Sequence, residues 1–298
     1  MKRFSSLSRQ LIFAALGLTF TCSLMAADSD GDGVDDSLDN AIYVANSSQL
    51  DTNGDGFGNV ADPDFNNDHF TNFVDLAYFR SVLYTTNLNP DADLDGDGFV
   101  GNSDLSILNS LFFQPPGPSG IAENINPGGS LPTGGVSAGS VSLVPASQNV
   151  AHGDPVDFQL IIDFTGDATL GGAIDIVFDP SVISFLSFDF EPGFASSPYS
   201  RLPDLGVGEL TGLAFGSMAG LDSALIGTLT FDSIGNGISS LSMTESFVGG
   251  GFYSFDSFAQ EPVFNSAEVT VVPVPAAVWL FGSGLLGLIG VSTRKKTA

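Results

Sequence analysis

Apolar and polar residues alternate in short runs along the second half of the chain. In residues 155–163, PVDFQLIID, the alternation places four apolar side chains on one face of a strand, namely Val156, Phe158, Leu160 and Ile162. Further strand candidates, bounded by Gly, Asp, Asn and Pro, occupy residues 171–188, 224–234, 237–244 and 266–272. Several short strands at regular spacing predict an all-β sandwich over residues 141–271.

The first half of the chain shows helical spacing at two places. Residues 76–86, LAYFRSVLYTT, carry apolar side chains at Leu76, Phe79, Val82 and Leu83. Residues 105–113, LSILNSLFF, carry them at Leu105, Leu108, Leu111 and Phe112. Each candidate helix follows an Asp-rich loop, and neither has a helix before its loop. The pattern predicts a small α module of paired loop–helix units in a multidomain chain.

Charge is distributed very unevenly. The chain has 298 residues, with 8 Lys and Arg against 34 Asp and Glu and a formal net charge of −26. Residues 28–112 carry 17 Asp, no Glu and a single basic residue, Arg80. Nucleic acid is therefore not an expected partner, because phosphate backbones require Lys and Arg. The hydrophobic fraction of 43% argues against an acidic disordered tail and leaves bound cations or a solvated exterior.

The acidic residues repeat in one frame of twelve positions. We name the four copies loop 1 (residues 28–39, DSDGDGVDDSLD), loop 2 (residues 51–62, DTNGDGFGNVAD), loop 3 (residues 64–75, DFNNDHFTNFVD) and loop 4 (residues 93–104, DLDGDGFVGNSD). Each has Asp or Asn at positions 1, 3 and 5, Val or Phe at position 7, and Asp at position 12. A merely acidic, solvated surface would not reproduce this frame four times.

The frame matches the oxygen-ligand requirement of Ca²⁺. A loop of this length can supply side-chain oxygens from positions 1, 3, 5, 9 and 12 and a backbone carbonyl from position 7, with Gly favoured at position 6. Mg²⁺ suits it less, because that ion keeps several of its waters. The candidate ligands are Asp28, Asp30, Asp32, Val34, Asp36 and Asp39 in loop 1; Asp51, Asn53, Asp55, Phe57, Asn59 and Asp62 in loop 2; Asp64, Asn66, Asp68, Phe70, Asn72 and Asp75 in loop 3; and Asp93, Asp95, Asp97, Phe99 and Asp104 in loop 4.

Both ends of the chain carry sorting features. Residues 1–27 have a basic start, an apolar run from Leu11 to Phe20 and small residues at Ala26 and Ala27, as in a secretory signal peptide. Its removal would take away Cys22 and leave a mature chain without disulfides. At the other end, residues 274–291 are free of charge and precede a basic cluster, which predicts a transmembrane helix.

The motifs resemble known families. The paired units D-x-D/N-x-D-G-x-x-x-x-x-D-L of residues 62–117 resemble a dockerin type I domain, with His69 in place of the family's Gly at position 6. Residues 28–61 resemble thrombospondin type 3 calcium repeats, with the order D-N…N-x-x-Q-x-D. Residues 141–271, with FDPSVISF at 178–185, are similar to cohesin domains, the usual receptors of dockerins. Residues 118–140 are a Pro-, Gly- and Ser-rich linker.

The C-terminal segment, residues 272–298, resembles a PEP-CTERM sorting tail of the VPLPA type, with Val274 where that variant usually has Leu. The resemblance implies an exosortase-type protease as a partner. It also implies a location at the envelope, surface or extracellular matrix of a Gram-negative bacterium, with transient membrane anchoring.

Two classes of function remain open from the sequence. The first is a non-catalytic calcium-binding matrix or surface protein that assembles with cohesin- or dockerin-bearing proteins, including copies of itself. The second is a carbohydrate-binding or accessory part of a polysaccharide-degrading system, with the Phe-rich residues 184–194 and 249–258 as sugar-stacking faces. An enzyme is not expected, because the mature chain has only His69 and His152, no Cys and no evident nucleophile–base set.

Overall fold

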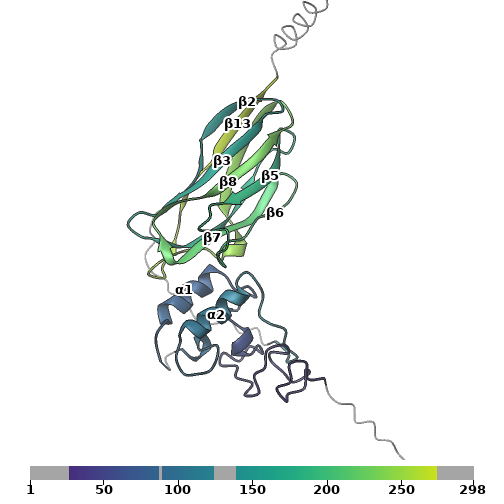
Figure 1. Cartoon of the computed structure of the whole chain (residues 1–298), viewed down its shortest axis with the longest axis vertical. Helices are drawn as coiled ribbons and strands as arrows, with labels where there is room; N and C mark the ends of the chain where they lie inside the picture. Colours follow the sequence, from purple (N-terminus) through teal and green to yellow (C-terminus); the bar gives the residue numbers. More distant parts are fainter. Residues whose placement is uncertain (1–26, 87–88, 124–138, 274–298) are drawn as a thin grey trace, which may run out of the picture.

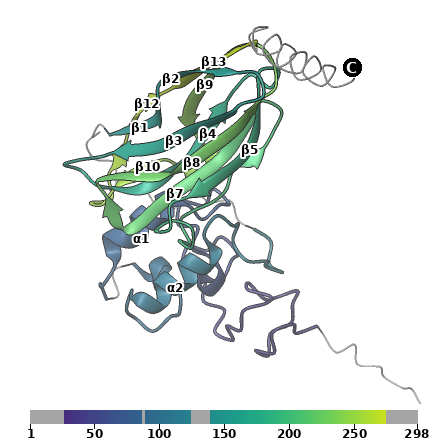
Figure 2. The same cartoon turned by 45° about the horizontal axis from the view of Figure 1, so that its top comes forward.

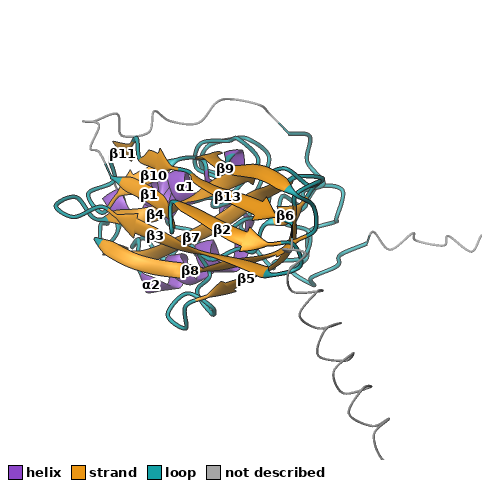
Figure 3. Cartoon of the chain, turned by 90° about the horizontal axis from the view of Figure 1, so that it is seen from above, coloured by secondary structure: helices purple, strands orange, loops and turns teal. Residues whose placement is uncertain are grey.

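The computed structural model describes residues 27–86, 89–123 and 139–273. Figure 1 shows a β-sandwich with the acidic region and its two helices packed against one end of it. The sandwich confirms the all-β prediction for the second half of the chain. Figure 3, seen from above, shows the strands in two layers with the helices beyond them.

The first layer is a five-stranded sheet in the order β12-β1-β3-β8-β5. Its strands are β1 (Ser140–Val144), β3 (Pro155–Asp163), β5 (Ile183–Phe190), β8 (Ser223–Ser233) and β12 (Val263–Asn265). The pairs β1–β3, β3–β8 and β5–β8 are antiparallel, whereas β1 and β12 run parallel.

The second layer has the order β11-β10-β4-β9-β13-β2, and β7 pairs with both β4 and β6. Its strands are β2 (Ser147–Ala151), β4 (Thr169–Val177), β6 (Asp204–Leu205), β7 (Glu209–Leu221), β9 (Gly237–Glu245), β10 (Phe252–Ser254), β11 (Ala259–Gln260) and β13 (Ala267–Val272). A short 3-10 helix, η3 (Phe247–Gly249), joins β9 to β10.

The sandwich core lies between these layers and is apolar. The alternation predicted for residues 155–163 is confirmed, because each of its four inward positions is fully buried, at Val156, Phe158, Leu160 and Ile162. Across the core they belong to one cluster with side chains such as Ile174 on β4 and Val269 on β13. Burying a large aliphatic or aromatic side chain contributes about 1.5–3 kcal/mol, so this core is a main source of the stability of the sandwich.

The acidic region is made mostly of loops, with the helices α1 (Phe73–Val82) and α2 (Asn102–Leu111) and the 3-10 helices η1 (Asn59–Ala61) and η2 (Pro90–Ala92). The two predicted helices are present, but each begins three residues earlier than its apolar spacing indicated. The reason is a capping contact, because Asp75 and Asp104 at the third helical position accept hydrogen bonds from the N-cap backbone. The last three residues of loops 3 and 4 are therefore helical.

The expected signal peptide and sorting tail lie almost entirely outside the described residues, which exclude 1–26 and 274–298. Among the residues that are described, no helix is long and apolar enough to cross a membrane. Residues 118–123, at the start of the predicted linker, pack against the acidic region: Pro118 accepts from the Ile42 amide and the Gly120 amide donates to the Asp39 carbonyl.

Candidate metal centres

The four loops share one backbone conformation. Positions 4 and 6 have positive φ in every loop, in the left-handed region that favours Gly. They are Gly31 and Gly33, Gly54 and Gly56, Asn67 and His69, and Gly96 and Gly98. The repeated frame read from the sequence therefore corresponds to a repeated structure.

Polar contacts repeat along the same frame. The position 1 carboxylate accepts from the position 6 amide at 3.1 Å in loops 1 and 2, 2.6 Å in loop 3 and 2.8 Å in loop 4. The position 5 carboxylate accepts from the position 7 amide at 2.8 Å in loops 1, 2 and 4 and 3.0 Å in loop 3. The side chains of Val34, Phe57, Phe70 and Phe99 thus take no part in the polar frame, as predicted for position 7.

Loop 4 gathers three carboxylates closely. One oxygen from each of Asp93, Asp95 and Asp97 lies within 4.8 Å of the others. The Oδ1 atom of Asp93 is buried and has no hydrogen-bond partner among the described residues. Asp104 at position 12 closes the loop, because it accepts from the amides of Asp95 at 3.1 Å and Gly101 at 2.7 Å. An orphaned buried oxygen inside a carboxylate cluster fits a cation ligand.

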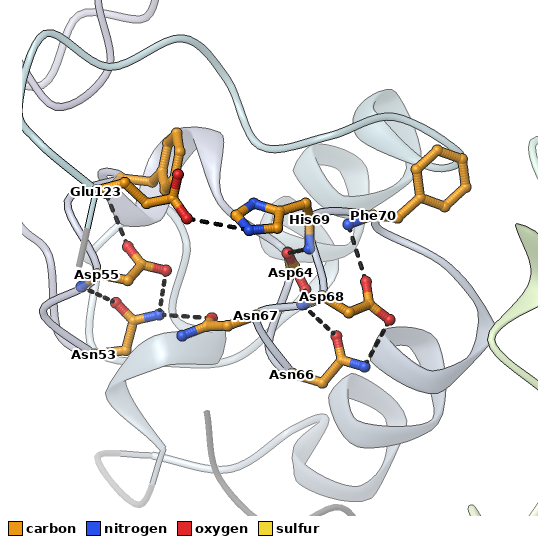
Figure 4. Close-up of polar contacts among 10 residues, drawn as sticks. Asn53, Asp55, Asp64, Asn66, Asn67, Asp68, His69, Phe70 and Glu123 are labelled. Carbon is orange, nitrogen blue, oxygen red and sulfur yellow. Dashed lines mark hydrogen bonds and ion pairs between the residues drawn. The ribbon is translucent and has the colours of Figure 1, made fainter. Parts of the chain in front are cut away.

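Loop 3 repeats this closure at the start of α1. Asp75 accepts from the amides of Asn66 at 3.4 Å and Asn72 at 2.8 Å. The Asn72 side chain caps the helix by accepting from the Val74 amide at 3.0 Å, so this predicted position 9 ligand points into the helix. Figure 4 shows Asp64, Asn66 and Asp68 of loop 3 converging, while His69 reaches across to Glu123, with Nε2 and Oε1 3.1 Å apart.

Loop 1 brings together Asp28, Asp30 and Asp32, with one oxygen of each within 4.8 Å of the others. Asp39 at position 12 is fully buried, and its Oδ2 atom has no hydrogen-bond partner among the described residues. Asp36, the predicted position 9 ligand, is occupied by the Ser29 amide at 2.7 Å and the Ser29 hydroxyl at 2.8 Å.

In loop 2, two of the predicted ligand side chains are engaged in hydrogen bonds. Asn53 donates to Asp55 at 2.9 Å, and Asn59 at position 9 turns away to donate to the Pro90 carbonyl at 2.9 Å. Asp62 at position 12 is buried beside Asp55 of its own loop and Asp64 of the next. Loops 2 and 3 therefore meet through buried carboxylates.

Burial disfavours the charged form of these carboxylates. It raises the pKa of Asp75 and of Asp62 well above the usual value, and neighbouring Asp charges add to the effect. It also raises the pKa of Asp64 and of Asp93, again with nearby Asp residues contributing. Arg80, the single basic residue of this stretch, is engaged with the sandwich and not with the loops. Desolvated like charges of this kind are compensated by a bound cation.

The sequence reading missed several residues that hold the ligands in place. Gln49 donates to Asp39 at 2.8 Å, and the Asn46 amide donates to Asp32 at 2.8 Å. Both residues belong to the N-x-x-Q-x-D motif, so the signal for them was present. Glu123 lies in the predicted linker, and its composition carried no such signal.

The Phe-rich segments predicted as possible sugar-stacking faces lie in the sandwich. The Phe-rich segments pack largely inward: Phe188 and Phe252 are buried, and Phe185, Phe190 and Phe255 pack against the two cores. These rings therefore act mainly as packing groups.

Five Glu residues of the sandwich could be considered as a catalytic carboxylate pair. Glu245 has a pKa raised by burial and then by the charge of Glu261. Glu191, Glu209 and Glu268 lie at the end of β5, at the start of β7 and in β13. The five carboxylates are thus spread over several parts of the sandwich.

No protein-family model and no curated protein sequence matches the chain. Solved structures that resemble its sandwich include cohesin domains. The seventh ScaB type I cohesin from Pseudobacteroides cellulosolvens is 11% identical, covers 47% of this chain and 96% of its own, and has a TM-score of 0.39.

A non-cellulosomal cohesin from Archaeoglobus fulgidus is 11% identical over 46% of this chain and 92% of its own, with a TM-score of 0.35. The sixth cohesin of Acetivibrio cellulolyticus scaffoldin B, solved with a Cel5 dockerin mutant, is 11% identical over 46% of this chain and 100% of its own, with a TM-score of 0.37. All three TM-scores are below 0.5.

Proposed function

We propose that the chain is a non-catalytic, calcium-binding, exported surface or matrix protein that mediates protein–protein assembly through dockerin–cohesin-type contacts. The observation that carries the proposal is the pair of loop–helix units in which Asp75 and Asp104 both close a twelve-residue acidic loop and cap the helix that follows it. An ion bound in either loop would be tied directly to the position of a helix.

Calcium is the ion that the donor set favours. Each loop offers carboxylate and backbone carbonyl oxygens, loops 2 and 3 add Asn side chains, and none has His or Cys at a ligand position. Hard dications prefer such oxygen ligands. The buried oxygen of Asp93 and the buried oxygen of Asp39 have no hydrogen-bond partner among the described residues, which supports a ligand there. In this proposal the other residues named for loops 1 to 4 hold the ions, while Asn72 caps α1 and Asn59 ties loop 2 to the Pro90 carbonyl.

The sandwich would serve as the binding partner and not as a catalyst. Its interior is a continuous apolar core and its Phe side chains are mostly used in packing. The sorting features of residues 1–27 and 272–298 support export and membrane-linked processing by an exosortase-type protease, which would put the protein on the cell surface or in the matrix.

The test uses the full chain immobilised through a tag, with calcium or with EDTA. Purified cohesin-bearing and dockerin-bearing proteins, a second copy of the chain, and soluble polysaccharides are offered in turn. Protein capture that requires calcium supports the proposal. Retention of polysaccharide without any calcium-dependent protein pairing would contradict it and favour the carbohydrate-binding alternative.

A further inference from the structure

The face of α1 that follows loop 3 fits a notch in the sandwich. Gly171 on β4 and Gly216 on β7 are paired across the two strands. A Cβ atom at Gly171 would lie 2.6 Å from Cε1 of Phe73, and one at Gly216 would collide with the same ring. The two glycines thus make room for the Phe73 ring, which is fully buried. Figure 2 shows α1 lying against this end of the sandwich.

Arg80 fastens the other end of α1. Its Nε atom donates to the Phe255 carbonyl at 2.5 Å, and its guanidinium carbon lies 3.3 Å from the centroid of the Phe255 ring. Its Nη1 atom donates to the Met218 carbonyl at 3.4 Å. The one basic side chain in a stretch of 17 Asp is therefore used to hold the sandwich. Cation–π contact and a charge-assisted hydrogen bond both favour this position.

The second helix makes its own contact. Asn109 on α2 accepts a hydrogen bond from the Tyr199 hydroxyl at 2.6 Å. The Phe112 ring meets the Tyr199 ring edge-on at 5.0 Å. Side chains of both helices thus share one buried apolar cluster with the sandwich residues Leu170, Ala173, Tyr199, Ala214 and Tyr253. Because the cluster is shared, the position of the helices depends on the sandwich, and the burial of these sandwich residues depends on the helices.

Loop 3 lies at the edge of this contact. Asn72, which caps α1, sits so close to Gly250 that a Cβ there would collide with its amide group. Phe73 comes next along the chain, and Asp75 follows within the same helical turn. The group that would close the calcium shell and the ring that fills the glycine notch are therefore two residues apart on one rigid element.

We propose that the helix pair docks on its own sandwich as a calcium-dependent clasp, in which calcium in loop 3 fixes the first turn of α1 and so seats Phe73 and Arg80 on the sandwich. The inference rests on the proposed calcium binding and names the partner: the module pairs with the sandwich of the same chain. Without the ion, the buried carboxylates of loop 3 repel one another, the first turn of α1 is lost, and the clasp opens.

Thiol protection in the full chain tests the clasp. Replacing Cys22→Ser removes the chain's single Cys, so that an introduced thiol is the one reported. Ala214→Cys places it in the cluster that helices and sandwich share, and Ala267→Cys places it in the sandwich's own core. Both alanines are buried, which makes them a matched pair. The readout is the rate of reaction with a thiol reagent in calcium and in EDTA.

The thiol of Ala214→Cys is expected to react at least about tenfold faster in EDTA, because local opening exposes it, whereas that of Ala267→Cys stays slow in both conditions. Asp68→Ala, at position 5 of loop 3, should speed the first reaction in calcium. Asp32→Ala, at position 5 of loop 1, should not. Arg80→Gln leaves every loop intact and should also speed the reaction of the Ala214→Cys thiol in calcium.

Calorimetry on the same proteins separates the two proposals. Calcium binding without any change at Ala214→Cys overturns the clasp and leaves the proposed function standing. Exposure of both thiols in EDTA also overturns it, because the sandwich itself would then depend on calcium. If no calcium binds, the proposed function fails and the clasp fails with it.

Discussion

The sandwich and the acidic region bury opposite kinds of side chain. The sandwich encloses an apolar core that includes Phe158, Ile174 and Val269. The acidic region encloses carboxylates, with Asp39, Asp75 and Asp104 fully buried beside small apolar clusters. Apolar burial stabilises a fold without help, whereas buried like charges oppose it until a counter-charge arrives. We therefore expect the sandwich to fold by itself and the acidic region to need an ion.

Removal of calcium should produce the largest difference between the two regions. In EDTA we expect residues 28–117 to lose their helical circular dichroism signal and their protection from hydrogen exchange, because the buried carboxylates of the acidic loops then repel one another with no ion between them. Residues 140–272 should stay protected. Exchange mapped by mass spectrometry checks both at once, and equal protection with and without calcium in residues 28–117 would contradict the comparison.

A cavity in the core of the sandwich should destabilise the sandwich, and calcium should not change the effect. Phe158→Ala removes a fully buried ring from β3 and is expected to cost the sandwich about 3–5 kcal/mol in its free energy of unfolding. The loss should be the same in calcium and in EDTA, as measured by denaturant titration. Phe99→Ala, at an exposed ring in loop 4, is the control and should leave the sandwich unchanged. A loss that calcium restores would contradict the independence of this core.

One substitution should abolish the candidate calcium site of loop 4. Asp93→Ala removes the carboxylate that receives the Gly98 amide and carries the buried, unpartnered oxygen. We expect the calcium stoichiometry to fall by one, measured by calorimetry. Asp232→Ala removes the same charge from an exposed position on β8 and should leave the stoichiometry unchanged. An unchanged stoichiometry in Asp93→Ala would place the ion elsewhere.

The calcium-free acidic region should be more stable in acid than at neutral pH. Burial raises the pKa of Asp62, Asp64 and Asp75 above the ordinary value of 3.8, so the folded state holds protons that the unfolded chain releases. This contribution is complete below pH 3.8 and is lost as the pH rises through the raised values. Circular dichroism in EDTA should show more helix at about pH 4 than at pH 7. With calcium the order should reverse, since the ion needs deprotonated ligands.

The smallest effect should come from the one loop that departs from the frame. His69 has φ of 69°, where the other three loops have Gly. His69→Gly relieves this strain and loses an exposed contact with Glu123, for a net gain of about 1 kcal/mol, or about fivefold tighter binding at loop 3. Calorimetry of the two proteins measures it. Weaker binding in His69→Gly would show that the Glu123 contact matters more than the backbone.

The sequence predicted those parts whose pattern is local. The alternation of residues 155–163 and the four acidic frames needed no partner elsewhere in the chain to be recognised. The longest strand, β7, was missed because ELTGLAFGSMAGL is Gly-rich and lacks strict alternation. Its antiparallel pairing with β4 holds it in the sheet, and this pairing leaves no local pattern in its own residues.

The contact between the two regions could not be predicted, for a related reason. Phe73 falls inside a calcium frame, and Gly171 and Gly216 fall in strands, so nothing local marks them as one packing site. Asn72 was assigned as a ligand by position, whereas helix capping takes its side chain. In each case a contact distant in sequence, or a competing local hydrogen bond, decides the outcome.

A calorimetric calcium titration of the full chain would show directly whether the four acidic loops bind the ion. We expect saturable binding of four ions per chain, one for each acidic frame, with loop 3 as the weakest site because of His69. The paired experiment uses a chain carrying Asp28→Ala, Asp51→Ala, Asp64→Ala and Asp93→Ala, in which binding should be lost while the sandwich stays folded. Absence of saturable binding in the natural chain, or equal binding in the substituted chain, would contradict the account.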